Sequence, residues 1–250
     1  MIDRRMDRAL FKKMKDAGCD WLYFGVESGS DRVLEAMNKK HRAADTLSVL
    51  RAAKESGIKA QANFMFGYPA ERKEDHELTL RHLEKIRPYI ESILASQSFC
   101  TLEKKTVMSE RFADFGIADG SHHLYWSSLD GRNNYMERFR RYEEFCRLAI
   151  ELGFPEGSGV FYEKPDKGIL IGDYHMYKGE FAEAAVAYRR FMEKYGAKPD
   201  ILRKEAAAYE MSGDKDKALK VYSDALDMYR DSSVTTSGIE TLKKKIEELK

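Results

Sequence analysis

The chain has 250 residues, 43% hydrophobic and 12% aromatic, which is enough for one large folded domain or two small ones. The formal net charge is only +1, so we expect no general attraction to nucleic acid or to an anionic membrane. No apolar run approaches the ~20 residues of a membrane-spanning helix. The three cysteines are far apart, which predicts buried thiols in a reducing, cytoplasmic setting rather than disulfides.

The N-terminal hundred residues alternate between helical and strand patterns. Met6, Leu10 and Met14 recur at helical spacing and predict a helix that ends at Gly18. Residues 21–26 form a short, nearly continuous apolar run, which predicts a strand that is buried on both faces.

Ser30 is typical of a helix N-cap, and Val33, Leu34 and Met37 follow it at helical spacing. The elements predicted next are a helix carrying Leu47, Leu50 and Ala53, a strand over 58–66, a helix over 74–86 and a strand over 92–99. Strands that recur about every 35 residues with a helix between them indicate βα units joined by right-handed crossovers.

The predicted fold class of this part is therefore α/β, with three parallel strands that belong to a barrel or to a doubly wound sheet. Three strands are too few to close a barrel. We expect either an open sheet or partner strands outside the chain.

Residues 101–165 are less regular, except for a strong helix over about 135–152 whose aromatic residues have helical spacing and should be core. The adjacent histidines His122 and His123 are poorly placed to share one metal ion, so we expect no metal site there. His76 and His82 lie on a polar helix, where we expect both to be solvated.

The C-terminal part contains an internal repeat of 34 residues, the period of tetratricopeptide repeats. Its packing signature consists of glycine at the turn, alanine at the helix contact and tyrosine between helices. These residues are Gly179, Ala184 and Tyr188, which recur as Gly213, Ala218 and Tyr222. Residues 238–250 are predicted to form a capping helix. The repeats resemble tetratricopeptide arrays, and the resemblance implies a protein or peptide partner.

The string GVESGS at 25–30 places a carboxylate, Glu27, directly after a predicted strand and before a helix. The carboxyl ends of strands face the ligand in α/β folds, so Glu27 is a candidate for binding hydroxyl or amino groups. The alternative is that Glu27 caps the following helix, and the residues alone leave both possibilities open.

This string, preceded by AGC at 17–19, resembles the fourth barrel strand of the radical S-adenosylmethionine (SAM) superfamily. The string FMFGYPAE at 64–71 resembles the end of the fifth strand, where relatives read GxPGET. Ala70 and Arg72 depart from that pattern in the turn. The similarity extends over about residues 1–155 and is strongest to members that carry an upstream cobalamin-binding domain.

The resemblance implies three SAM-binding residues. Glu27 would contact the ribose or the methionine end of SAM, Lys39 in the following helix would pair with its carboxylate, and Asn63 would lie near the ribose. The alternatives are a solvated lysine at a helix end for Lys39 and a satisfied core amide for Asn63. By the same resemblance, Trp126 and the loop around Asn133 would line a substrate pocket.

The family's defining motif, CxxxCxxC, binds a [4Fe–4S] cluster that cleaves SAM, and this sequence lacks it. We therefore expect the C-terminal part of a radical SAM barrel over 1–120, a helical extension and linker over 121–167, and tetratricopeptide repeats over 168–250. On this interpretation the chain is a fragment without catalysis of its own. The alternatives are a non-catalytic interaction module with a barrel remnant and a non-functional gene product.

Overall fold

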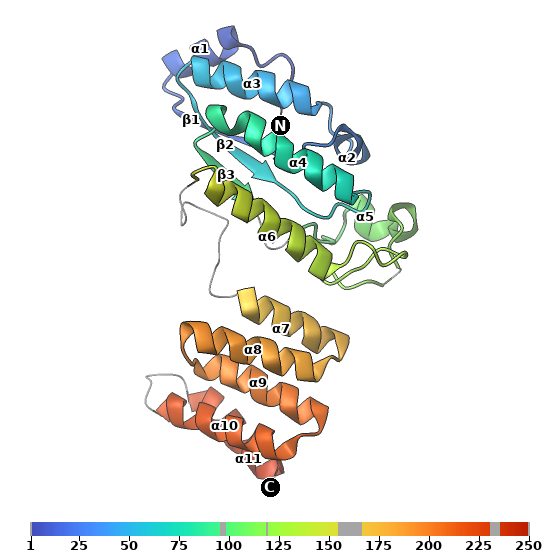
Figure 1. Ribbon diagram of the computed structural model, residues 1–250, viewed down its shortest axis with the longest axis vertical. Coiled ribbons are helices and arrows are strands. Elements are labelled where there is room, and N and C mark those ends of the chain that lie inside the picture. Colours follow the sequence, from blue (N-terminus) through green and yellow to red (C-terminus); the bar gives the residue numbers. More distant parts are fainter. Residues whose placement is uncertain (1, 96–98, 119, 155–166, 231–235, 250) are drawn as a thin grey trace. The chain divides into compact units, whose positions relative to one another are not determined.

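The computed structural model describes residues 2–95, 99–118, 120–154, 167–230 and 236–249. The chain divides into two compact units, Met1–Tyr162 and Glu163–Lys250, and each is described separately below. Figure 1 shows strands and helices in the first unit and helices alone in the second. Within the described parts of the chain, no helix has the length and apolar character needed to cross a membrane.

The first unit alternates helices and strands along the chain. Two short 3-10 turns, at Arg87–Tyr89 and Phe112–Phe115, interrupt the series. The elements in order are α1 (Arg8–Asp16), β1 (Trp21–Glu27), α2 (Asp31–Ala36), α3 (Ala43–Glu55), β2 (Lys59–Phe64), α4 (Lys73–Ile86), β3 (Ser92–Ala95), α5 (Val107–Glu110) and α6 (Tyr135–Glu151).

The three strands form one sheet in the order β1-β2-β3, and both strand pairs are parallel, as predicted. Gly25 pairs with Asn63, but the next pair joins Glu27 to Phe64, so one residue of β1 is skipped at its carboxyl end. The third strand is shorter than predicted and ends at Ala95, and residues 96–98 lie outside the described part of the chain.

The prediction that residues 21–26 are buried on both faces is wrong. Burial alternates along β1: Phe24 and Val26 are buried, whereas Trp21 and Tyr23 are 37% and 66% exposed. Strand β2 alternates in the same way. One face of the sheet is therefore packed and the other is open, which is unusual for parallel strands.

Helices α3, α4 and α6 lie side by side over the packed face (Figure 1). The ring of Phe145 on α6 contacts Phe64 of β2, with 4.7 Å between ring centroids. The aromatic residues predicted as core on this helix, Tyr135, Phe139, Tyr142 and Phe145, are all buried. The sequence pattern of α6 therefore predicts its packed face correctly.

The second unit contains helices only: α7 (Lys167–Lys178), α8 (Phe181–Tyr195), α9 (Pro199–Ser212), α10 (Lys215–Arg230) and α11 (Thr236–Leu249). Consecutive helices pack against one another. A Cβ on Gly172 would lie 2.3 Å from the ring of Tyr188, so glycine lets that ring reach the backbone of α7. The equivalent pair, Ala206 and Tyr222, shares one buried cluster. The tetratricopeptide identification stays a prediction, and much of its predicted linker lies outside the described residues.

Candidate functional site

The chain folds back on itself where β1 ends. Glu27 has a positive φ of 65°, a conformation that costs a non-glycine residue free energy and that often occurs at ligand sites. A Cβ on Gly25 would lie 2.6 Å from Oε1 of Glu27. Glycine at 25 therefore leaves the space in which the Glu27 carboxylate lies over the strand.

Lys39 reaches this carboxylate and donates from Nζ to Oε1 of Glu27 at 2.9 Å. The prediction placed Lys39 within the helix after β1, but α2 ends at Ala36, so Lys39 lies in the turn beyond it. The two side chains are 30% and 17% exposed, Lys39 and Glu27 respectively. The ion pair is thus preformed and remains accessible to a ligand, and Lys39 is not the solvated helix-end lysine of the alternative.

Asn63 lies on β2 directly opposite Gly25 and is half-buried. Its Oδ1 accepts a hydrogen bond of 3.1 Å from Nε2 of Gln61, and Oε1 of Gln61 accepts one of 3.1 Å from Ser92. Three polar side chains thus continue across β2 and β3 on the less buried face of the sheet. Asn63 belongs to this polar row and not to the packed core.

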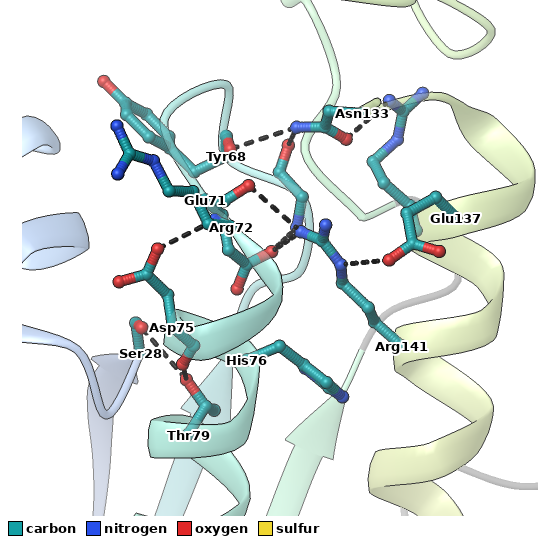
Figure 2. Close-up of polar contacts among 12 residues, drawn as sticks. Ser28, Tyr68, Glu71, Arg72, Asp75, His76, Thr79, Asn133, Glu137 and Arg141 are labelled. Atoms are coloured by element: carbon teal, nitrogen blue, oxygen red, sulfur yellow. Dashed lines mark hydrogen bonds and ion pairs between the residues drawn. The ribbon is translucent and has the colours of Figure 1, made fainter. Parts of the chain in front are cut away.

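Residues of α4 hold the turn after Glu27, and the sequence analysis missed them. Oγ1 of Thr79 contacts Oγ of Ser28 at 3.0 Å and accepts a hydrogen bond from the Gly29 amide at 3.0 Å, and all three residues are buried (Figure 2 draws the Ser28 contact). Ser30 donates to Oδ1 of Asp75 at 2.6 Å. The partners are 45 to 51 positions apart in the sequence, so no local sequence pattern predicts these contacts.

Ser30 caps α2, as predicted, and its hydroxyl accepts the Val33 amide at 3.4 Å. Glu27 makes no side-chain contact with the helix amides in the described structure, so the alternative of a capping role for Glu27 is wrong. Arg32, on α2, forms an ion pair with Asp75 and donates to the Ala70 carbonyl. This pair links the turn after β1 to the turn after β2.

A second glutamate, Glu71, follows β2 and is enclosed by protein. Its Oε2 accepts hydrogen bonds from the Gly67 amide at 2.5 Å and from Nη1 of Arg141 at 2.7 Å (Figure 2). The Glu71 and Arg141 side chains are only 1% and 4% exposed. Burial raises the pKa of the Glu71 carboxyl, and the Arg141 guanidinium and the Gly67 amide oppose that rise.

The same turn is held from the loop before α6. Nδ2 of Asn133 donates to the carbonyls of Gly67 and Tyr68 at 3.0 and 3.1 Å. The buried Arg138 stacks on the ring of Trp126, with its guanidinium carbon 4.1 Å from the ring centroid. Trp126 is 1% exposed and belongs to a hydrophobic core cluster, so it packs in the core and does not line the cavity described next.

An open cavity of about 990 Å³ lies over this turn, at the carboxyl end of β2. Asn133 lines it, in agreement with the expectation for the loop around that residue. Its wall comes from α2, from the β2–α4 turn, from the loop before α6 and from α6 itself. Its lining residues include Arg72, Lys73, Phe115, Leu129 and Arg141.

The expectation for the histidines of α4 is wrong. His76 and His82 are 1% and 5% exposed, and burial lowers the pKa of each imidazole to about 4. Their helix carries many charged residues, but they occupy its packed face. The rings of His122 and His123 contact each other at a tilt, with 4.3 Å between ring centroids. Among the described residues, no group of three His, Cys, Asp or Glu side chains is arranged to hold a metal ion.

The cysteines do not fit an iron–sulfur cluster. Cys100 and Cys146 are buried, and burial raises the pKa of both thiols to about 12, which disfavours the thiolate that ligates iron. Cys19 is half-buried and lies before β1. Glu27, Lys39 and Asn63, in contrast, fit a polar ligand, because they combine an accessible carboxylate, an ammonium and an amide.

Comparisons with known proteins relate the N-terminal part of the chain to one superfamily. Residues 2–83 match the family model of the radical SAM superfamily. A protein of Pyrococcus horikoshii, named as an uncharacterized methyltransferase, is 36% identical over 75 residues, which cover 30% of this chain and 16% of that protein.

The tRNA-2-methylthio-N(6)-dimethylallyladenosine synthases of Ehrlichia canis and Bifidobacterium adolescentis are 31% identical over 88 residues and 41% identical over 68 residues. The matches cover 34% and 26% of this chain but only 20% and 14% of those enzymes. The mixed α/β architecture with a small parallel sheet is consistent with part of a radical SAM fold. Residues 2–83 are thus similar in sequence to radical SAM domains.

Proposed function

We propose that the first unit is the C-terminal portion of a partial TIM-type radical SAM barrel and supplies one side of a SAM-binding site. Glu27, Lys39 and Asn63 are its binding residues. The observation that carries this proposal is the accessible Glu27–Lys39 ion pair at the carboxyl end of β1, beside a backbone turn with positive φ.

The ion pair is complementary to the methionine end of SAM, which carries an ammonium and a carboxylate on one carbon. The Glu27 carboxylate accepts hydrogen bonds from the ammonium, and Lys39 pairs with the carboxylate. Binding of this zwitterion replaces the Glu27–Lys39 ion pair by two ion pairs with the ligand. Neither protein charge is then left without a partner. Asn63, next to Gly25 in the sheet register, offers its amide group to the ribose.

The [4Fe–4S] cluster supplies the electron that cleaves SAM in this superfamily. The ligands for such a cluster are not among the three cysteines of this chain, so protein outside residues 1–250 provides them in our proposal. The isolated chain then binds SAM without cleaving it. Cobalamin use stays a proposal based on resemblance alone. A cytoplasmic location stays a proposal based on the wide spacing of the three cysteines.

The complete enzyme's reaction is also a proposal. The names of the similar proteins favour transfer of a methyl or methylthio group. The matched segment does not identify the acceptor, because it corresponds to a small part of those proteins and one barrel scaffold supports many reactions.

Equilibrium dialysis of the full chain against radiolabelled SAM tests the proposal. Three variants remove the proposed contacts one at a time: Glu27→Gln, Lys39→Met and Asn63→Ala. Lys40→Met is the matched control, because Lys40 is the neighbouring lysine but pairs with Asn38 instead.

We expect saturable binding with a Kd of roughly 0.1–1 mM, since only part of the site is present. Glu27→Gln and Lys39→Met should each weaken it by about tenfold or more, because each leaves one charge of the ligand unpaired. Lys40→Met should bind like the wild type. Equal binding by Lys39→Met and Lys40→Met, or no saturable binding at all, contradicts the proposal.

A second candidate function is protein interaction through the helical unit. Gly179 and Gly213, 34 residues apart, both have positive φ and end helices, and equivalent alanines are buried after each. This regularity supports the tetratricopeptide prediction, and such arrays bind extended peptides in a groove. Peptides selected on the full chain should lose binding when the 60% exposed Met211 becomes aspartate. Peptide binding in the absence of SAM binding would favour this candidate.

A further inference from the structure

The cavity over the turn after β2 contains a buried cation with unused hydrogen-bonding capacity. Arg141 donates from Nη1 to Glu71 and from Nε to Glu137 at 2.9 Å. Its Nη2 has no hydrogen-bond partner among the described residues, although the side chain is 4% exposed and lines the cavity. Figure 2 shows this nitrogen directed away from both carboxylates.

Two further cations lie at the same cavity. Arg72 and Lys73 begin the first turn of α4 and line the opening. Both side chains are exposed, and neither makes an ion pair or a hydrogen bond with the described residues. An anion in this cavity would therefore meet Nη2 of Arg141, whose Nη1 and Nε already bond carboxylates, and two cations that have no ion-pair partner among the described residues.

Most carboxylates that line the cavity are already paired with arginine side chains. Glu137 accepts from Arg140 and Arg141, and Asp130 accepts from Arg132 and Ser128, so their charges are compensated. Glu74 is the carboxylate of the lining without a partner among the described residues.

The remaining lining is partly apolar. Phe115 and Leu129 contribute hydrophobic surface, and Leu129 is 71% exposed. A concave site with apolar walls and a few converging polar groups is typical of small-molecule binding.

We propose that this cavity binds a small organic oxyanion, a carboxylate or a phosphate monoester with an apolar body, through Nη2 of Arg141. Arg72 and Lys73 attract the anion to the opening, and Phe115 and Leu129 contact its apolar part. The proposal does not depend on SAM binding at Glu27 and Lys39, because the two sites use different residues.

Nuclear magnetic resonance titration of the full chain tests this assignment. The probes are benzoate and phenyl phosphate, which share an apolar ring and differ in the oxyanion, so they separate a carboxylate ligand from a phosphate ligand. We expect at least one probe to give saturable shifts of the Arg141 side-chain signal and of the backbone amides at 116 and 129, with a Kd of about 1–10 mM.

Variants locate the binding. Arg141→Lys should weaken it by about tenfold, because an ammonium cannot bond Glu71, Glu137 and a ligand with the planar geometry of a guanidinium. Because that variant also changes a buried ion pair, Leu129 offers a test that leaves the interior intact. Leu129→Asp should weaken binding, and Leu129→Lys should strengthen it, each by about two- to threefold at low salt.

The control is Leu10→Asp, which introduces the same charge at a leucine of similar type that is 40% exposed and does not line the cavity. It should leave the Kd unchanged. The absence of saturable shifts with both probes would overturn the proposal. It would also be overturned if Leu129→Asp and Leu129→Lys changed the Kd in the same direction, or if Leu10→Asp matched Leu129→Asp. None of these outcomes bears on SAM binding, which dialysis measures separately.

Discussion

Two glutamates, Glu27 at the end of β1 and Glu71 in the turn after β2, each pair with a cation, and the two pairs differ in burial. Glu27 and Lys39, after β1, are 17% and 30% exposed and meet at 2.9 Å. Glu71 and Arg141, after β2, are 1% and 4% exposed and meet at 2.7 Å. The distances are similar, but only the second pair is enclosed by protein.

This difference in burial leaves the first ion pair accessible to a ligand, whereas the second pair stabilises the fold. A pair that solvent can reach contributes little to stability and can exchange partners. A buried pair has lost its water, so removing one partner leaves an uncompensated charge in the interior. In our proposal, burial therefore distinguishes the ligand-binding Glu27 from the structural Glu71.

The largest effect expected of a single substitution is that of Glu71→Ala. It leaves Arg141 buried without this carboxylate and frees the Gly67 amide, so we expect a loss of about 3–5 kcal/mol in the free energy of unfolding. Urea denaturation followed by circular dichroism measures it. Glu74→Ala, at an exposed glutamate in the same region, is the control and should change the free energy by less than about 0.5 kcal/mol. A loss below about 1 kcal/mol for Glu71→Ala would contradict the assigned role.

Acid should lower the free energy of unfolding through the two buried histidines of α4. The imidazoles of His76 and His82 have pKa values lowered from 6.5 to about 4 by burial, so below pH 6.5 the unfolded chain binds more protons than the native one. Stability should be fully present above pH 6.5 and fall as the pH decreases toward 4, by on the order of 3 kcal/mol for each histidine. The measurement is the urea midpoint against pH. His82→Gln should reduce the slope, and an unchanged slope would contradict the assignment.

Thr79→Val should have an intermediate effect. The substitution keeps the volume but removes the hydroxyl that contacts Ser28 and accepts the Gly29 amide, both buried. We expect a loss of about 1–3 kcal/mol. Thr79→Ser, which retains the hydroxyl, should recover part of it. If serine and valine behave alike, the hydrogen bonds do not hold the turn.

The smallest effect on stability is expected for Lys39→Met. Because the pair with Glu27 is solvent-accessible, its loss should cost less than about 1 kcal/mol in the free energy of unfolding. Urea denaturation of this variant beside Glu71→Ala compares the two pairs directly. A cost equal to that of Glu71→Ala would mean that both pairs are structural.

The alternating pattern of the sequence predicts the order of helices and strands and the parallel sheet. It also predicts the Ser30 cap and the buried face of α6, because these depend on residues close together in the chain. The contacts that hold the two turns join residues up to 70 positions apart, such as Glu71 and Arg141, and no local pattern contains them.

Two wrong predictions have the same physical origin. Residues 21–26 are apolar enough for burial on both faces, yet Trp21 and Tyr23 are exposed, because no described element of the first unit covers that side of the sheet. His76 and His82 sit on a polar helix, but the helix turns their side of its surface toward the core. In both cases the burial of the side chains depends on which other elements pack against the strand or helix. The composition of the strand or helix does not predict that packing.

The central claim is that Glu27 and Lys39 bind a ligand and contribute little to the stability of the fold. Urea unfolding of the wild type and of Lys39→Met, each with and without saturating SAM, tests it in a single measurement. We predict similar midpoints without SAM, and a rise on adding SAM for the wild type alone, because a ligand stabilises only the state that binds it. A Lys39→Met midpoint that rises with SAM as much as the wild type's would contradict the claim.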